Sequence, residues 1–186
     1  MISGNLWHLL EAGPRVPEEI HVIVEIPKGV RNKYEYNKDL GFLRLDRVLY
    51  SPLHYPGDYG LIPRTFYEDG DPLDALVMIN EPTFPGCVIL ARPIGLFRML
   101  DRDLPDDKVL AVPVNDPIFA SYHDIADIPQ HFLAEVGHFF QVYKDLEGVR
   151  TKAIGWEPAV MAKERILHAV RLYEERFGKE KPLSER

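Results

Sequence analysis

Proline and glycine interrupt the first two thirds of this chain so densely that short extended segments are expected there. The sequence holds 16 prolines and 13 glycines, and the runs between them are short and rich in β-branched residues. Proline cannot donate a backbone hydrogen bond, and both residue types favour turns. The pattern therefore predicts a series of short strands joined by turns, not long helices.

Five runs are predicted as strands. Ile20–Ile26 is rich in β-branched residues, and Phe42–Tyr50 alternates apolar and polar side chains over most of its length, as a half-buried strand does. Cys87–Phe97 contains Pro93 and Gly95, where we expect a bend or bulge. The remaining two predicted strands are Ala75–Ile79 and Lys108–Val114.

The last third of the chain changes to helical periodicity. Asp127–Pro129 has the form of a helix start, and apolar residues then recur at helical spacing until about Gly148. A second helix is predicted from about Glu157–Pro158 to Gly178. The charged tail 179–186 is expected to fray.

Strands grouped first and helices last favour an α+β fold with a mainly β core over an alternating parallel sheet. A small barrel of about five strands with helices packed outside fits this order. The length of 186 residues suits one domain, and 46% hydrophobic with 27% charged residues is ordinary globular composition. No repeat or linker is visible, so a single domain over residues 1–186 is expected.

The charge balance and the cysteine content bear on the class of protein. Asp and Glu number 29 against 22 Lys and Arg, giving a net charge of −7, which is unlike a basic nucleic-acid-binding domain. Cys87 is the only cysteine, so a disulfide within the chain is impossible and a reducing compartment is expected. The N-terminus is a poor signal peptide, and no apolar run approaches the ~18 residues of a membrane span.

Three carboxylates lie within the six residues Asp69-Gly70-Asp71-Pro72-Leu73-Asp74. Such a run often forms only a turn, but Pro72 stiffens this one and Asp74 leads directly into a predicted strand. Crowded carboxylates repel one another unless a cation binds between them. In proteins this cation is usually a hard divalent ion, which prefers oxygen ligands. The spacing does not fit an EF-hand. An aspartyl-phosphate enzyme is a weak alternative, because no phosphate-binding helix start follows.

A second acidic cluster spans Asp101–Lys108, between two predicted strands. By itself it would be an unremarkable surface loop, but two such clusters at strand ends favour a shared site. The seven histidines form no zinc-binding pattern, and neither a serine-hydrolase elbow nor a P-loop is present.

Taken together, these motifs resemble those of the soluble family I inorganic pyrophosphatases. Asp69–Asp74 is similar to the family's Asp-x-Asp-Pro-hydrophobic-Asp pattern, and the resemblance covers roughly residues 20 to 156. The segment lengths resemble the compact bacterial and archaeal members. The other blocks that resemble the family, in order, are Glu25–Pro27, Lys33–Glu35, Leu45–Arg47, Tyr55–Gly60, Gly86–Val88, Asp101–Lys108, Ala111–Pro113, His138–Glu147 and Gly155–Trp156.

The resemblance implies a five-stranded OB-like β-barrel with flanking α-helices. It also implies Mg²⁺-dependent hydrolysis of inorganic diphosphate to two phosphates, with several Mg²⁺ ions per active site and direct attack of a metal-activated water. The chain is then expected to be a cytoplasmic homo-oligomer, a hexamer by this resemblance, with no nucleic-acid or membrane partner.

The resemblance further assigns roles to individual residues. Asp71 is the expected general base, and Asp74 is expected to be shared between two metals. The expected metal ligands are Asp69, Asp74, Asp101, Asp106, Glu25 and Glu35. The expected substrate-binding residues are Lys33, Arg47, Tyr59, Lys108, Tyr143 and Lys144.

Three positions depart from the family pattern or leave it ambiguous. Arg102 stands where several members carry an acid, and residues 148–152 lack a Lys-Trp pair common there. Asp106 and Asp107 are adjacent, so the ligand position is ambiguous by one residue, although the Asp-x-Lys spacing favours Asp106.

Two other functions compete with this reading. One is a noncatalytic OB-type module that binds single-stranded nucleic acid, and the other is a catalytically inactive homologue that serves as an interaction subunit. The net charge opposes the first, and the presence of both acidic clusters with their cationic partners opposes the second. His138 lies on the apolar helix and is expected to be a core or subunit-contact residue.

Overall fold

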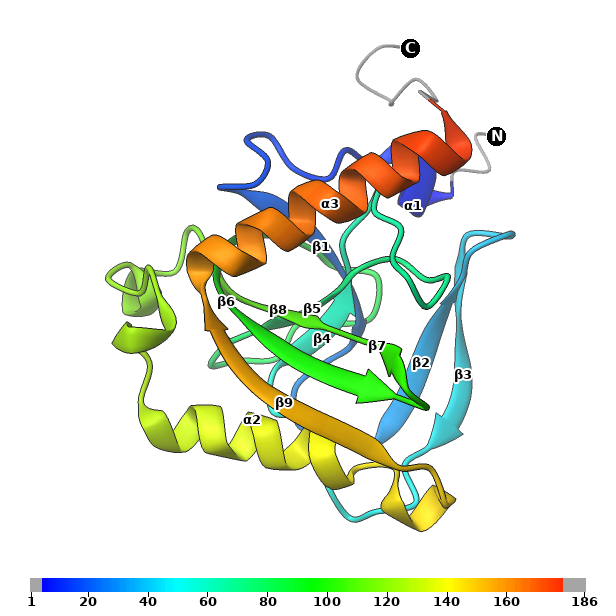
Figure 1. Ribbon diagram of the computed structural model, residues 1–186, viewed down its shortest axis with the longest axis vertical. Coiled ribbons are helices and arrows are strands. Elements are labelled where there is room, and N and C mark those ends of the chain that lie inside the picture. Colours follow the sequence, from blue (N-terminus) through cyan, green and yellow to red (C-terminus); the bar gives the residue numbers. More distant parts are fainter. Residues whose placement is uncertain (1–4, 179–186) are drawn as a thin grey trace.

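Five strands close into a ring at the centre of this computed structural model, which describes residues 5–178. β1 pairs with both β4 and β6, and this closes the ring in the order β1-β4-β5-β8-β6. Every pairing in the ring is antiparallel except that of β5 with β8. The predicted α+β class and five-stranded barrel are confirmed (Figure 1). The five strands are β1 (Ile20–Ile26), β4 (Asp58–Leu61), β5 (Asp74–Val77), β6 (Val88–Asp101) and β8 (Lys108–Pro113).

Two further strands extend the sheet, and a hairpin lies beside it. The 14-residue β6 runs beyond the barrel, where β9 (Thr151–Pro158) and the short β7 (Leu104–Pro105) pair with it. β2 (Asn32–Asn37) and β3 (Phe42–Val48) form a separate antiparallel hairpin. The register of β6 against β8 shifts between Pro93 and Gly95, so the predicted irregularity is confirmed.

Two helices cover different faces of the barrel (Figure 1). α2 (Gln130–Val142) buries Val136 and Phe140 in a cluster that includes Leu76 of β5, whereas α3 (Ala159–Phe177) buries Ile166 in a second cluster that includes Ala75 and Val77 of the same strand. The shorter elements are α1 (Leu6–Leu9), η1 (Pro117–Phe119), η2 (Ile125–Asp127) and η3 (Asp145–Glu147). None of the described helices is long and apolar enough to cross a membrane.

The boundaries of the first long helix differ from those predicted. Asp127 does not begin α2, because its carboxylate accepts the backbone N–H groups of His123 and Asp124 within η2. α2 ends at Val142, and Gly148, in a left-handed conformation, ends η3 instead. The second helix lies between Pro158 and Gly178, as predicted. The tail 179–186 lies outside the described residues.

Candidate active site

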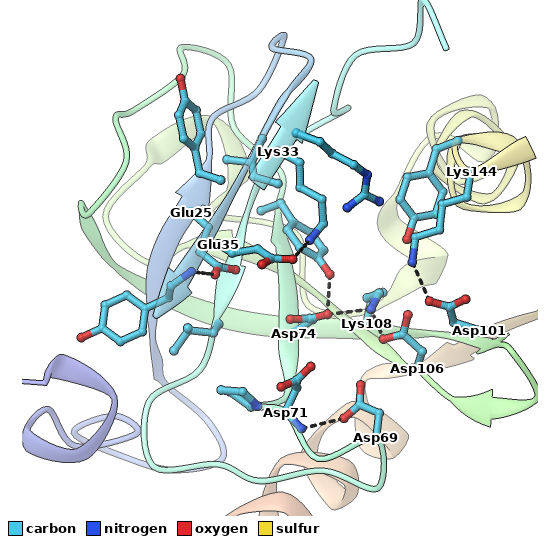
Figure 2. Close-up of a pocket in the computed structure, with 18 of the residues that line it drawn as sticks. Glu25, Lys33, Glu35, Asp69, Asp71, Asp74, Asp101, Asp106, Lys108 and Lys144 are labelled. Carbon is cyan, nitrogen blue, oxygen red and sulfur yellow. Dashed lines mark hydrogen bonds and ion pairs between the residues drawn. The ribbon is translucent and has the colours of Figure 1, made fainter. Parts of the chain in front are cut away.

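A cavity of about 940 Å³ lies between the β2–β3 hairpin, the two acidic loops and the C-terminal end of α2. Every residue that the sequence resemblance assigned to the site lines this cavity. The acids are Glu25, Glu35, Asp69, Asp71, Asp74, Asp101 and Asp106, and the other groups are Lys33, Arg47, Tyr59, Lys108, Tyr143 and Lys144. Segments separated by more than a hundred residues therefore meet at one place (Figure 2).

The parallel pairing of β5 with β8 brings the two acidic loops together. Asp74, the first residue of β5, lies opposite Lys108, the first residue of β8. Parallel neighbours begin at the same end of a sheet, so the loops that precede these strands converge there. Asp101, the last residue of β6, reaches the same place because β6 runs antiparallel to β8.

One side of the cavity, called here the acidic wall, carries the carboxylates of Glu25, Asp69, Asp74, Asp101 and Asp106. Lys108 lies among these carboxylates. Its Nζ is 2.6 Å from Asp74 Oδ2 and also contacts the carboxylate of Asp106, and its side chain is only 3% exposed. Burial alone would lower the pKa of Lys108, but the nearby Asp106 and Asp74 carboxylates outweigh burial and hold this pKa well above its usual value. Lys108 is therefore charged throughout the physiological pH range.

Three other carboxyl groups of this wall lack enough cationic partners to stabilise their ionised form fully. Burial, reinforced by the negative charge of Asp74 in both cases, raises the pKa of Asp69 to about 7 and that of Glu25 to about 8. The buried Oδ1 atom of Asp101 has no hydrogen-bond partner among the described residues, although its Oδ2 is 2.5 Å from Lys144 Nζ. The wall therefore holds more carboxyl groups than its own cations can keep ionised.

This surplus suits divalent cations. An oxygen donor set of carboxylates from separate loops is what Mg²⁺ and similar hard ions prefer, and the unpartnered oxygen of Asp101 is a free ligand position. Within residues 5–178, no three acidic, histidine or cysteine side chains already surround one point. Lys108 instead lies between Asp74 and Asp106.

The opposite wall carries cations and comes largely from the hairpin. Lys33 of β2 and Arg47 of β3 are paired across the two strands. Lys33 Nζ is 2.5 Å from Glu35, and Arg47 Nη2 is 2.9 Å from Glu147. These groups are suited to hold the oxygens of a small polyanion.

Two buried tyrosines complete the cavity. Burial raises the pKa of Tyr59 and that of Tyr143 well above the ordinary value for a phenol, so both are neutral hydrogen-bond donors at neutral pH. The Tyr59 hydroxyl donates to the carboxylate of Asp74. Tyr143 stands at the end of α2 beside Lys144, whose ammonium is 5.2 Å from the centre of the Tyr143 ring.

Asp71 differs from the other acids because its side chain is 56% exposed. Its backbone N–H donates to Asp69 Oδ1 at 3.0 Å, which fixes the loop, and its carboxylate contacts the ammonium of Lys38. The sequence resemblance assigned no role to Lys38, Arg44 or Glu147, all of which line the cavity. Only the folding of the hairpin over the loop brings Lys38 to Asp71.

The structure places Asp106 and Asp107 on different sides of the chain. Asp106 lines the cavity, whereas Asp107 is 3% exposed and bonds to Tyr67 and Arg165 instead. Successive residues of an extended chain point to opposite sides. Of these two aspartates, Asp106 is therefore the one placed to reach a cation in the cavity.

His138 lies away from this cavity. It lines a second cavity, of about 630 Å³, between α2 and β9, together with Phe97 and Trp156. Its expected role in subunit contact stays a prediction.

Comparison with known proteins gives a consistent result. The family described as inorganic pyrophosphatase matches residues 22–174. An inorganic pyrophosphatase of Haloferax volcanii is 53% identical over 94% of this chain and 99% of that relative. Soluble inorganic pyrophosphatase 1 of Arabidopsis thaliana is 44% identical over 94% of this chain and 82% of its own length. The crystal structure of inorganic pyrophosphatase from Thermus thermophilus has a TM-score of 0.88 at 42% identity, covering 92% of this chain and 99% of that one.

Proposed function

Since this chain belongs to the inorganic pyrophosphatase family and is a hydrolase of diphosphate, we propose that it acts with several bound Mg²⁺ ions through direct attack of water. The observation that carries this proposal is the convergence of an acidic wall and a cationic wall on one cavity. An acidic cavity alone would repel a polyanionic substrate, so the surplus of buried carboxylates points to divalent cations as its partners.

The metal ligands in this proposal are Asp69, Asp74, Asp101 and Asp106, with Glu25 and Glu35 in outer or additional positions. Bound Mg²⁺ would lower the pKa of the attacking water and neutralise phosphate oxygens. Asp74 is proposed to be shared between two ions, because it stands at the start of β5 between the two acidic loops. Tyr59 and Lys108, which both contact Asp74, orient its carboxylate.

Asp71 is the proposed general base. It is the most exposed carboxylate of the loop and is bonded through its backbone, not its side chain, to Asp69. Its exposed carboxylate contacts the ammonium of Lys38 and is placed to receive a proton from the attacking water. Lys33, Arg47, Tyr143 and Lys144 hold the phosphate oxygens and stabilise the charge that develops on the leaving phosphate.

Phosphate release from diphosphate tests this proposal directly. We expect rapid release with Mg²⁺, loss of release in EDTA, restoration when Mg²⁺ is returned, and much slower release from ATP. Undiminished release after thorough chelation would remove the metal from the mechanism. Retention of single-stranded DNA without any phosphate release would favour the OB-type binding module instead.

Three further properties belong to the proposal. We propose a single inorganic pyrophosphatase domain over residues 1–186, a cytoplasmic location and a homo-oligomer, a hexamer by resemblance. The single free Cys87 suits a reducing compartment, and the apolar cavity beside His138 offers a contact face. Sedimentation equilibrium of the purified chain gives the subunit number, and a monomer at micromolar concentration would contradict the hexamer.

A further inference from the structure

Three side chains that the proposed mechanism does not use form a buried polar cluster behind the acidic loops. The Tyr67 hydroxyl donates to Asp107 Oδ2 at 3.0 Å and accepts from Arg165 Nη1 at 2.8 Å. Arg165 Nη2 is 3.1 Å from the same carboxylate oxygen. None of the three lines the cavity, and Tyr67 and Asp107 are 2% and 3% exposed.

Tyr67 anchors the first acidic loop. Its backbone N–H donates to the carbonyl oxygen of Asp71 at 2.7 Å, and its carbonyl oxygen accepts the N–H of Gly70 at 3.0 Å. The loop that carries Asp69 and Asp71 is thereby closed on Tyr67. The backbone of Tyr67 thus holds the backbone of Asp71, the proposed general base, in place.

Asp107 anchors the second acidic loop. Its Oδ1 accepts the backbone N–H of Met99 on β6 at 3.3 Å, and the neighbouring Asp106 N–H donates to the Met99 carbonyl oxygen at 3.0 Å. Because Asp107 lies between Asp106 and Lys108, its position fixes two groups that face the cavity on the other side of the chain.

Arg165 supplies the charge that allows a carboxylate to be buried here. A buried charge is tolerated only when it is paired and hydrogen-bonded. Arg165 extends from α3, its guanidinium carbon is 5.5 Å from the centre of the Tyr67 ring, and its side chain is 22% exposed. The two acidic loops are therefore bonded both to each other and to a helix outside the barrel.

We propose that Tyr67, Asp107 and Arg165 form a clamp that holds the two acidic loops at a fixed separation and so sets the affinity of the cavity for divalent cations. They are positioning residues, since none touches the cavity. The affinity part of this inference rests on the proposed metal-dependent function. The mechanical coupling of the loops does not.

Two measurements on the full chain test the clamp. The first is Mg²⁺ binding by titration calorimetry without substrate. Tyr67→Phe keeps the ring and removes both hydrogen bonds of the hydroxyl, to Asp107 and to Arg165, so its Kd should be about tenfold weaker than that of the parent. Saturating Mg²⁺ should restore kcat to within about threefold, because the chemical groups themselves are unchanged.

The second measurement is hydrogen exchange of backbone amides. In Asp107→Asn, which alters the second loop, the peptide over residues 68–74 of the first loop should exchange faster. Ile166→Val is the matched control, because Ile166 is fully buried on α3 next to Arg165 and is not part of the clamp. It should lower the melting temperature without changing either the Mg²⁺ Kd or exchange in residues 68–74.

The outcomes separate the two proposals. If Tyr67→Phe and Asp107→Asn match Ile166→Val in both measurements, the clamp is overturned. If Asp107→Asn does not fold, both measurements are made on Tyr67→Phe, whose ring still fills the site. A parent protein that binds Mg²⁺ but releases no phosphate overturns the proposed mechanism and leaves the clamp standing. A parent protein that binds no Mg²⁺ overturns the proposed effect of the clamp on Mg²⁺ affinity. The hydrogen-exchange measurement then decides whether the clamp couples the two loops.

Discussion

The ammonium of Lys108 lies 2.6 Å from the Asp74 carboxylate, across the one parallel strand pair of the barrel. Both groups come from the first residues of their strands, and Lys108 also contacts Asp106. Lys108 thus balances two carboxylates that we propose as metal ligands. Its removal is expected to affect the protein most when no metal is present.

Lys108→Met should lower the free energy of unfolding by about 3 kcal/mol in EDTA, because removing one partner of a buried ion pair leaves an uncompensated charge. Saturating Mg²⁺ should recover much of this loss. Urea denaturation under both conditions measures it. Lys163→Met removes an α3 ion pair with the exposed Glu18 and should cost no more than ~1 kcal/mol under either condition. An equal loss with and without Mg²⁺ would show that Lys108 does not substitute for a cation.

Asp71→Asn should reduce kcat by a factor of about 10²–10⁴, the usual contribution of a general base. The Kd for Mg²⁺ should stay near that of the parent, because Asp71 is not among the proposed ligands. Steady-state phosphate release and titration calorimetry measure the two quantities. Asp39→Asn is the control, since Asp39 also lines the cavity and has no assigned role. Full turnover by Asp71→Asn would exclude Asp71 as the base.

Asp74→Asn should weaken Mg²⁺ binding more than substitution of any other acid in the cavity, and by more than about tenfold. The reason is its proposed sharing between two ions. Asp103→Asn is a fitting control, because Asp103 lies in the turn next to Asp101 with a φ of 65° that asparagine also tolerates. Equal Mg²⁺ affinity in the two variants would rule out Asp74 as the shared ligand.

The stability of the metal-free protein should fall as pH rises through the neutral range. Glu25 has a pKa of about 8 in the folded protein against about 4.3 when unfolded. Between these values the unfolded chain releases this proton while the folded protein retains it, so rising pH favours unfolding. Above pH 8 both states are ionised and this contribution is constant.

Urea denaturation in EDTA between pH 5 and 9 measures this dependence, and Glu25→Gln isolates it because the amide does not titrate. The parent should lose more stability than the variant over this interval. Parallel pH profiles for the two proteins would mean that Glu25 is ionised in the metal-free fold.

Gly60→Ala should prevent correct closure of the barrel. β1 and β4 approach so closely that a Cβ at Gly60 would lie 2.0 Å from the Ile23 carbonyl oxygen, and backbone cannot yield by that much. Circular dichroism and thermal melting measure the loss. Gly137→Ala on α2 is the control, because its Cβ would meet only ordinary contacts and should stabilise the helix by up to ~1 kcal/mol. A well-folded Gly60→Ala protein would contradict the strand geometry.

The local sequence pattern was sufficient to predict an element where the residues that define it lie within the element itself. Ile20–Ile26 was predicted with the limits that β1 has, and the bend of β6 was predicted from Pro93 and Gly95. The end of α3 followed from Gly178. These features depend on side chains within a few residues of one another, so they can be recognised without knowledge of the fold.

Strands that depend on their neighbours were missed. The sequence pattern predicts no strand over β2, which contains the charged Lys33 and Glu35, and none over β4 or β9. β2 is extended because β3 pairs with it, and β9 because the long β6 offers a free edge. Intrinsic strand preference is weak compared with such pairing, so the sequence of each segment alone did not indicate it.

The sequence by itself determined the fold class and the family, and it indicated the residues proposed as catalytic, metal-binding and substrate-binding, because each is encoded in short motifs whose chemistry is local. Only the tertiary structure decided how those motifs meet. The pairing of β5 with β8 set Asp74 beside Lys108, the hairpin carried Lys38 to Asp71, and the burial of Asp107 against Arg165 turned Asp106 toward the cavity. Such contacts join segments far apart in the chain and depend on register and barrel closure, which no local pattern specifies.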